Sequence, residues 1–267
     1  MNALRGKGLR ISLGGVAVLQ GIELALDAGE MLGVIGPNGA GKSTLMKLIA
    51  GLLPAASGEL TLDGAPLAGM PRGERARRFA YLPQEGVVHW PLTVAQLIAL
   101  GRLPHLARGQ RPGEHDHAII RRVMRQTGLE SLQARRLDTL SGGERARALL
   151  ARALAVEPEI LLVDEPVAAL DPAHQLEVME LLRRHCERGG AVLVILHDLR
   201  LASHYCDRLQ LLHSGAGLAA GSPQKVLTRT NLSRAYGITL SPASLTAAEA
   251  FALTWELLPR RAEGQGP

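Results

Sequence analysis

A glycine-rich segment near the N-terminus has the residue types and spacing that hold phosphate groups. Its members are Gly36, Pro37, Asn38, Gly39, Ala40, Gly41, Lys42, Ser43 and Thr44. Glycines let successive backbone N–H groups turn inward around phosphates, and the helix expected from residue 42 points its positive N-terminal end at them. The Lys42 ammonium can reach the terminal phosphates of a nucleotide, and the Ser43 hydroxyl can ligate Mg²⁺. A complete pattern between an apolar strand and a helix argues against a glycine-rich turn that arose by chance.

Two carboxylates follow a second apolar run, residues 160–163. Asp164 stands where a second contact to Mg²⁺ is needed, and Glu165, one residue further, can polarise an attacking water. Taken alone, Asp-Glu after a strand is usually only a strand end. Because a phosphate-binding loop lies upstream, the pair indicates hydrolysis of a nucleotide.

The segment Leu-Ser-Gly-Gly-Glu at residues 140–144 allows two interpretations. It predicts a helix start, because Ser141 is a suitable N-cap and Glu144, three residues later, completes a capping box. It also suits close approach to a phosphate, because Gly142 and Gly143 are costly in a first helical turn but leave the backbone open. The two interpretations are compatible with each other.

These segments together resemble the nucleotide-binding subunits of ABC transporters, and the resemblance covers nearly the whole chain. In that family the Leu-Ser-Gly-Gly-Gln/Glu signature motif contacts the γ-phosphate of ATP on the phosphate loop of a second copy. The resemblance therefore implies ATP and Mg²⁺ as cofactors and two ATP sites at a head-to-tail homodimer interface. Beyond the phosphate loop it implies nucleotide contacts from Ser141, Gly142, Gly143, Glu144 and Asp171.

Three further residues match motifs of the same family in the expected order. Gln84 matches the Q-loop glutamine, which senses Mg²⁺ and the water and contacts the membrane partner, and Asp171 lies in the D-loop. His197 matches the switch histidine at the γ-phosphate, although a lone His there is otherwise an ordinary strand-end residue. The catalytic residues implied are Glu165, His197 and Gln84. The Mg²⁺ ligands implied are Ser43, Gln84 and Asp164.

Apolar runs that alternate with helical patterns predict an α/β fold whose mixed, largely parallel sheet is covered on both faces. Strands are expected at 9–13, 22–26, 31–35, 58–62, 78–82, 160–163, 191–196 and 208–212. Helices are expected at 42–50, 141–155 and 172–186. Apolar residues recur at helical spacing over 94–101 and 118–127, with a Pro/Gly/His-rich break at 104–112, which predicts a mostly helical insertion.

The resulting organisation is a single ABC ATPase domain over residues 1–267. Its P-loop NTPase core is expected at 1–85 and 140–240 and includes an N-terminal antiparallel β subdomain. An inserted α-helical subdomain is expected at 86–139, and a C-terminal tail at 241–267.

Composition and charge bear on the partners. The net charge is +5, but the basic residues are scattered among acidic ones, which disfavours nucleic acid as a partner. No apolar run reaches the length of a membrane-spanning helix, so another chain must supply any membrane part. With the family resemblance, the expected partners are a second copy, transmembrane permease subunits and, indirectly, a substrate-binding protein. The expected location is the cytoplasmic face of the inner cell membrane, as a peripheral subunit.

A more diffuse similarity concerns the cargo. Residues 93–106, together with 174–177 and 226–238, resemble the matching stretches in importers of iron–siderophore complexes, haem and cobalamin. This favours an importer ATPase of the iron–siderophore, haem or cobalamin type. An ABC exporter ATPase and a soluble ABC ATPase of cluster assembly remain as alternatives.

One departure from the family concerns the adenine base. The family usually places an aromatic residue before the first Gly-Gly turn, where it stacks on adenine. Here that position is Leu13, and no Phe, Tyr or Trp precedes Gly36. Stacking of a base on an aromatic ring is worth about 1–3 kcal/mol, so nucleotide binding is expected to depend mostly on the triphosphate.

Overall fold

The structure is a computed structural model that describes residues 3–55, 57–84, 91–168 and 170–237. The expected tail at 241–267 and the start of the expected helical insertion at 86–90 lie outside these ranges. None of the helices in the described part is both long and apolar enough to cross a membrane.

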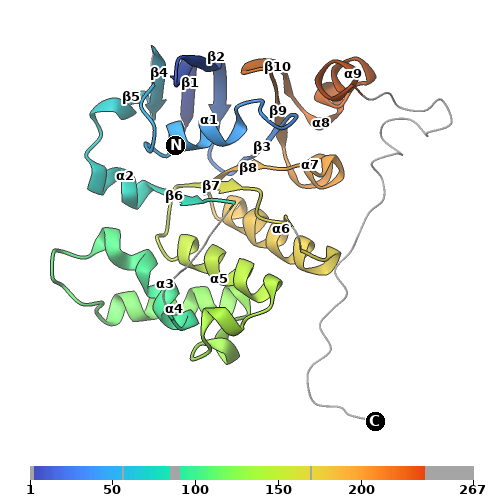
Figure 1. Ribbon diagram of the computed structural model, residues 1–267. Helices are drawn as coiled ribbons and strands as arrows, with labels where there is room; N and C mark the ends of the chain where they lie inside the picture. The colour runs from blue at the N-terminus through green and yellow to red at the C-terminus, as the bar shows by residue number, and fades with distance from the viewer. Residues whose placement is uncertain (1–2, 56, 85–90, 169, 238–267) are drawn as a thin grey trace, which may run out of the picture.

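A six-stranded sheet forms the centre of the molecule (Figure 1). Its order is β10-β9-β3-β8-β7-β6, and every pair is parallel except β9 with β10. The strands are β3 (Met31–Ile35), β6 (Phe79–Leu82), β7 (Ile160–Asp164), β8 (Ala191–Ile195), β9 (Arg208–His213) and β10 (Ala216–Gly221). The predicted mixed, largely parallel sheet is therefore confirmed.

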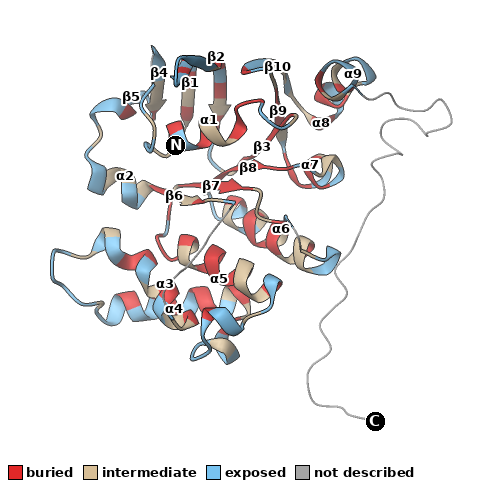
Figure 2. Cartoon of the chain, in the orientation of Figure 1, coloured by how far each residue is buried: buried red, intermediate tan, exposed pale blue. Residues whose placement is uncertain are grey.

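Both faces of this sheet are buried, which explains why its central strands read as continuous apolar runs. In β7, Ile160 and Leu162 belong to one apolar cluster, and Leu161 and Val163 belong to the other. The first cluster includes α1 (Lys42–Ile49), and the second includes α5 (Gly142–Leu154) and α6 (Pro172–Glu187). In Figure 2 the central strands are buried along their length, whereas the helices are exposed on their outer sides.

A second, antiparallel sheet is built mainly from the N-terminal segment, as expected. Its order is β2-β1-β4-β5. The strands are β1 (Leu4–Leu13), β2 (Val16–Leu26), β4 (Ser57–Leu62) and β5 (Ala65–Pro66). β1 and β2 are longer than the sequence predicted and meet at the turn Gly14-Gly15, where both glycines have positive φ. This sheet packs against the same face of the central sheet as α1.

The region between β6 and α5 is mostly helical in its described part. It contains α3 (Val94–Ala99) and α4 (Glu114–Thr127). A 3-10 helix at Leu100–His105 follows α3 and reaches only the start of the break expected at 104–112, and the rest of that break lies in the loop before α4. In Figure 1 these helices lie at the end of the molecule opposite the antiparallel sheet. The buried Arg102 side chain donates to Asp116 at 2.9 Å and to Glu157 at 3.0 Å, which joins this region to the loop before β7. The domain boundaries at 86 and 139 stay a prediction.

Helix α2 (Arg72–Arg78) was not predicted, and β6 begins at Phe79 rather than at Arg78. The helix has no buried residue, so it lacks the apolar period that reveals a helix in a sequence. Its Arg75 guanidinium donates to the carbonyls of Leu48 and Ile49 at 3.3 and 2.5 Å. A tertiary contact with the end of α1 therefore holds this helix.

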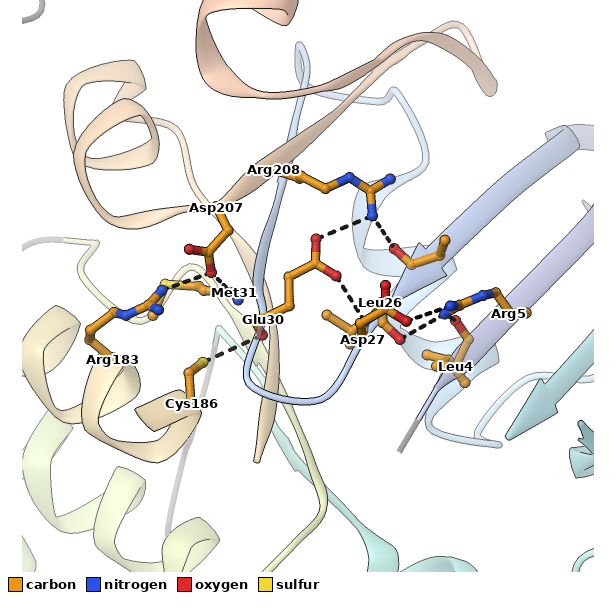
Figure 3. A network of polar contacts seen from close by, with 11 residues as sticks. Leu4, Arg5, Leu26, Asp27, Glu30, Met31, Arg183, Cys186, Asp207 and Arg208 are labelled. Atoms are coloured by element: carbon orange, nitrogen blue, oxygen red, sulfur yellow. Dashed lines mark hydrogen bonds and ion pairs between the residues drawn. The ribbon is translucent and has the colours of Figure 1, made fainter. Parts of the chain in front are cut away.

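A network of charged residues fixes the start of β3, the strand that leads into the phosphate loop (Figure 3). The Asp207 carboxylate accepts from the backbone N–H of Met31 at 2.8 Å and from Arg183 on α6 at 2.7 Å. The Glu30 carboxylate accepts from Arg208, at the start of β9, at 3.2 Å. Helix α6 and strand β9, both distant from β3 in the sequence, are thus held at one end of β3.

Three further α-helices and one strand of the central sheet were also not predicted. They are α7 (Leu199–Tyr205), α8 (Pro223–Val226) and α9 (Arg229–Tyr236), together with strand β10. All three helices pack on the same apolar cluster as α5 and α6.

Candidate functional site

A pocket of about 610 Å³ lies at the carboxyl ends of β3, β7 and β8, the edge of a parallel sheet where ligands bind in such folds. Its lining residues are Val18, Asn38, Gly39, Gly41, Lys42, Ser43, Thr44, Gln84, Glu165 and His197. The chain thus brings the predicted phosphate loop together with all three predicted catalytic residues. Gly36, Pro37 and Ala40 belong to the same loop but do not line the pocket.

Glycine is required in the phosphate loop by the close approach of neighbouring backbone. Gly36 has φ +147°, and a Cβ there would lie 2.3 Å from the carbonyl oxygen of Leu212 on β9. Gly41 has φ +95°, and a Cβ there would lie 3.0 Å from the carbonyl oxygen of Val18. Helix α1 begins directly after Gly41, so its first N–H groups face the loop, as an anion site needs.

Lys42 is buried beneath the loop. Its ammonium donates to the carbonyl oxygens of Gly36 at 2.8 Å and Pro37 at 3.0 Å. Burial lowers the pKa of Lys42, and the negative charges of Glu165 and Asp164 oppose that shift. A cation held by carbonyls inside a loop of N–H groups fits the terminal phosphates of a nucleotide.

Asp164 provides the test of whether a Mg²⁺ ion suits this site. Its side chain is buried, Oδ2 lies 3.4 Å from the Tyr81 hydroxyl, and the Ser43 hydroxyl also hydrogen-bonds to the carboxylate. Oδ1 is buried and has no hydrogen-bond partner among the described residues. Burial raises the pKa of Asp164, although these hydrogen bonds oppose the rise. A buried carboxylate oxygen without a partner beside a hydroxyl is costly unless a cation with oxygen ligands binds there, so the residues fit Mg²⁺.

Gln84, Glu165 and His197 come from three separate segments and meet at one point. The Gln84 amide donates to Glu165 Oε2 at 2.6 Å, and His197 Nε2 lies 2.5 Å from Glu165 Oε1. Glu165 has φ +51°, an unfavourable backbone conformation for a residue with a side chain. Such conformations cluster at functional sites, where the surrounding structure enforces them. The three side chains are placed to act on one reacting group.

The signature segment begins helix α5, as its capping pattern predicts. The backbone N–H of Ser141 donates to Glu144 Oε2 at 2.8 Å, and the N–H of Glu144 donates to Ser141 Oγ at 3.2 Å. The first of these bonds lowers the pKa of Glu144. Neither these residues nor Gly142, Gly143 and Asp171 line the phosphate-loop pocket of their own chain. Ser141, Gly142 and Asp171 are instead exposed, so a second chain has access to them.

Three residues near the site were not predicted as members of it. Val18 lines the pocket, and Tyr81 contacts Asp164, an arrangement in which burial raises the pKa of Tyr81 to about 12. The Tyr236 hydroxyl at the end of α9 accepts from the backbone N–H of Gly36. The contact of Tyr81 with Asp164 could have been expected, because Tyr81 and Asp164 lie near the ends of β6 and β7, two parallel strands that end at the same edge of the sheet. For Val18 and Tyr236 the contact depends on tertiary packing alone.

Leu13, at the position where the family usually has an aromatic residue, is 44% exposed and does not line the pocket. The apolar contact in the pocket comes from Val18 instead.

Comparisons with known proteins agree with this geometry. The family model described as ABC transporter matches residues 19–168. The hemin import ATP-binding protein HmuV of Pseudomonas entomophila (strain L48) is 44% identical over 237 residues, which are 87% of this chain and 91% of that relative. The protein of the same name from Streptomyces coelicolor is 44% identical over 229 residues, which are 86% of this chain and 81% of that relative.

Solved structures give the same result. One, described as a metal-chelate type ABC transporter in an inward-facing conformation, matches with a TM-score of 0.79 at 26% identity and covers 90% of both chains. Another, described as the ATP binding subunit of an ABC transporter, matches with a TM-score of 0.72 at 29% identity, over 89% of this chain and 95% of that one. The chain therefore belongs to the ABC transporter family as an ATP-binding domain, an ATPase whose activity is coupled to transport.

Proposed function

We propose that this chain is the ATP-hydrolysing subunit of an importer that takes up haem or a related iron chelate. The observation that carries the proposal is the 44% identity, over most of both chains, to two proteins named for hemin import. The likeness to a solved structure described as a metal-chelate type transporter supports it. The segments at 93–106 and 174–177 favour the same group, as the sequence indicated.

The working unit would be a head-to-tail homodimer attached to transmembrane permease subunits, which in turn meet a substrate-binding protein. The exposed position of Ser141, Gly142 and Asp171, away from their own pocket, supports this arrangement, because a second copy can then place its loop against them. The subunit would be peripheral, at the cytoplasmic face of the cell membrane. Nucleic acid is not among the proposed partners.

Within each site the chain's own residues divide the work. The N–H groups of the phosphate loop and Lys42 hold the triphosphate. Ser43, Asp164 and Gln84 would hold Mg²⁺, which when bound supplies positive charge against the phosphate oxygens. Glu165 accepts a proton from the water that attacks the γ-phosphorus, as the bond from that phosphorus to the ADP oxygen breaks. His197, in contact with Glu165, steadies the γ-phosphate. Catalysis is then mainly positioning and charge stabilisation.

The direct test is replacement of a relative in its own cell. A Pseudomonas entomophila strain without its hemin import ATP-binding protein should grow with hemin as its only iron source when this chain is supplied. The matched control is the Glu165→Gln chain, which keeps the fold but should not restore growth. If the parent chain is expressed, hydrolyses ATP and co-purifies with the host permease but still fails to restore growth on hemin, the proposed cargo is wrong. An exporter ATPase or a soluble ATPase of cluster assembly would give that negative result.

A further inference from the structure

The first turns of α6 carry a segment that the site described above does not use. His174, Gln175, Leu176 and Glu177 resemble importer ATPases in sequence, and each side chain makes a specific contact. The Gln175 amide donates to the carbonyls of Val167 at 3.4 Å and Leu170 at 3.1 Å, in the loop between Glu165 and the D-loop. Leu176 is buried in the core. The segment therefore holds the chain that follows the catalytic carboxylate.

The His174 ring fills the space beside the signature glycine Gly143. A Cβ at Gly143 would lie 2.4 Å from His174 Cδ2 and 2.5 Å from its Cγ. Cγ is the ring atom bonded to Cβ, so rotation of the ring about the Cβ–Cγ bond cannot move it away. Gly143 has ordinary helical φ, so the requirement for glycine at this position within the chain comes from His174 and not from backbone conformation.

The same ring contacts the D-loop. His174 Nδ1 lies 2.5 Å from Asp171 Oδ2, and the other oxygen of Asp171 accepts from the backbone N–H of His174 at 3.1 Å. Turning the side chain about its Cα–Cβ bond to make room at Gly143 would break the Nδ1 contact. The clash could also be relieved if α5 and α6 moved apart. The ion pair between Arg147 on α5 and Glu177 on α6 opposes that separation.

We propose that His174 is a positioning residue that couples the signature turn at Gly143 to the D-loop residue Asp171 within one chain. The inference rests on the proposed role of these two segments at the ATP site of a second copy. His174 makes the two segments move as one unit when that site closes. It also makes the geometry of the signature turn depend on a residue outside every motif of the site.

A double-mutant cycle tests the steric half of the proposal. Gly143→Ala should reduce kcat in the parent chain by a factor about ten times larger than the factor by which it reduces kcat in the His174→Ala chain. A coupling of that size is within the range found for residues in contact. His174→Asn keeps Cγ and a donor near Asp171, so Gly143→Ala should still cost the full factor in that chain. The matched control is Gly142→Ala, whose Cβ would meet only Leu170 Cδ2 at 3.9 Å. Its effect should not depend on residue 174.

Measurements of kcat, KM and melting temperature test whether His174 positions the signature turn or only stabilises the fold. His174→Ala should lower kcat by about fivefold, as loss of a coupled contact does, while KM for ATP and the melting temperature stay near those of the parent. His174→Asn should restore most of the loss. A lowered melting temperature with unchanged kcat would show that His174 only stabilises the fold and would overturn the proposal. Equal costs of Gly143→Ala in the parent and His174→Ala chains would overturn it as well.

A replacement variant and a parallel control distinguish failure of this inference from misfolding and from failure of the proposed catalytic site. If His174→Ala does not fold, Asp171→Ser replaces it: serine still caps α6 but leaves the ring without its carboxylate partner, and Gly143→Ala should lower kcat less there than in the parent. An unchanged cost would contradict the coupling. The Glu165→Gln chain is measured in parallel. If that chain loses turnover but the cycle shows no coupling, this inference fails alone. If it keeps turnover, the proposed catalytic site fails.

Discussion

The phosphate loop and the signature turn are both glycine-rich starts of helices, yet they need glycine for different reasons. At Gly36 the backbone lies in a region that favours glycine, and its nearest neighbour is a main-chain carbonyl on β9. At Gly143 the backbone is helical, and the neighbour is the His174 side chain. A main-chain neighbour cannot be removed by substitution, whereas a side chain can. The phosphate loop is therefore fixed by the fold, and the signature turn is adjustable through one residue.

Glu165→Gln should produce the largest effect, because it leaves both glycine-rich turns intact and removes only the base. ATP binding should persist, and turnover should fall by about a hundredfold or more, as expected for loss of an acid–base group. The chain should accumulate as a closed ATP-bound dimer on a sizing column with ATP and Mg²⁺. Hydrolysis at the parent rate would remove Glu165 from its assigned role.

Gly36→Ala tests whether the phosphate loop needs glycine because a main-chain carbonyl lies against it. The clash with the Leu212 carbonyl cannot be relieved, so ATP affinity should fall by about a hundredfold or more, roughly 2.8 kcal/mol. Gly39→Ala is the matched control. It also has positive φ, but a Cβ there meets no protein atom within 4 Å, so this variant should lower ATP affinity less than Gly36→Ala does. Titration with a fluorescent ATP analogue measures both, and equal losses would show that crowding at Gly36 is irrelevant.

Asp164→Asn separates stability from activity at the same pocket. Burial raises the pKa of Asp164, so the folded state holds its proton more tightly than the unfolded state does. The charged form therefore costs stability once the pH exceeds both pKa values, and that cost disappears in acid. The variant should melt at a higher temperature than the parent at neutral pH without Mg²⁺, and in a chain of this size each 1 kcal/mol of relieved cost raises the melting temperature by about 2–4 °C. The variant should also lose ATPase activity. A gain in melting temperature equal at pH 3 and pH 7 would contradict this origin.

The smallest effect concerns the base of the nucleotide. Leu13 does not line the pocket, and the triphosphate contacts come from the phosphate loop and Asp164. GTP should therefore compete with ATP within about tenfold, roughly 1.4 kcal/mol, and Leu13→Tyr should tighten ATP binding. A competition titration with ATP, GTP and CTP measures this. Hundredfold discrimination against GTP would mean that another residue reads adenine.

The sequence predicted the phosphate loop and the pair Asp164 and Glu165 from their residue types after apolar strands, whereas His197 was identified only through the family resemblance. The structure places them at one site because parallel strands end at the same edge of the sheet. The sequence did not predict α2, whose residues are all outside the core and whose position depends on Arg75 and the end of α1. Strand β10 is rich in Gly and Ala, which are depleted in strands, so it gave no signal. The contact between Gly143 and His174 needs the packing of α5 on α6, which no local pattern reveals.

In the proposed homodimer, the two glycine-rich turns that complete one ATP site come from different chains. A Lys42→Ala chain and a Ser141→Arg chain should each be inactive alone. A mixture should recover activity, because the mixed dimer then has one site with both defects and one intact site. Cross-linking shows how much mixed dimer forms. Recovery in proportion to that fraction is the expected result, and a mixed dimer that forms but hydrolyses no ATP would contradict independent sites shared between two chains.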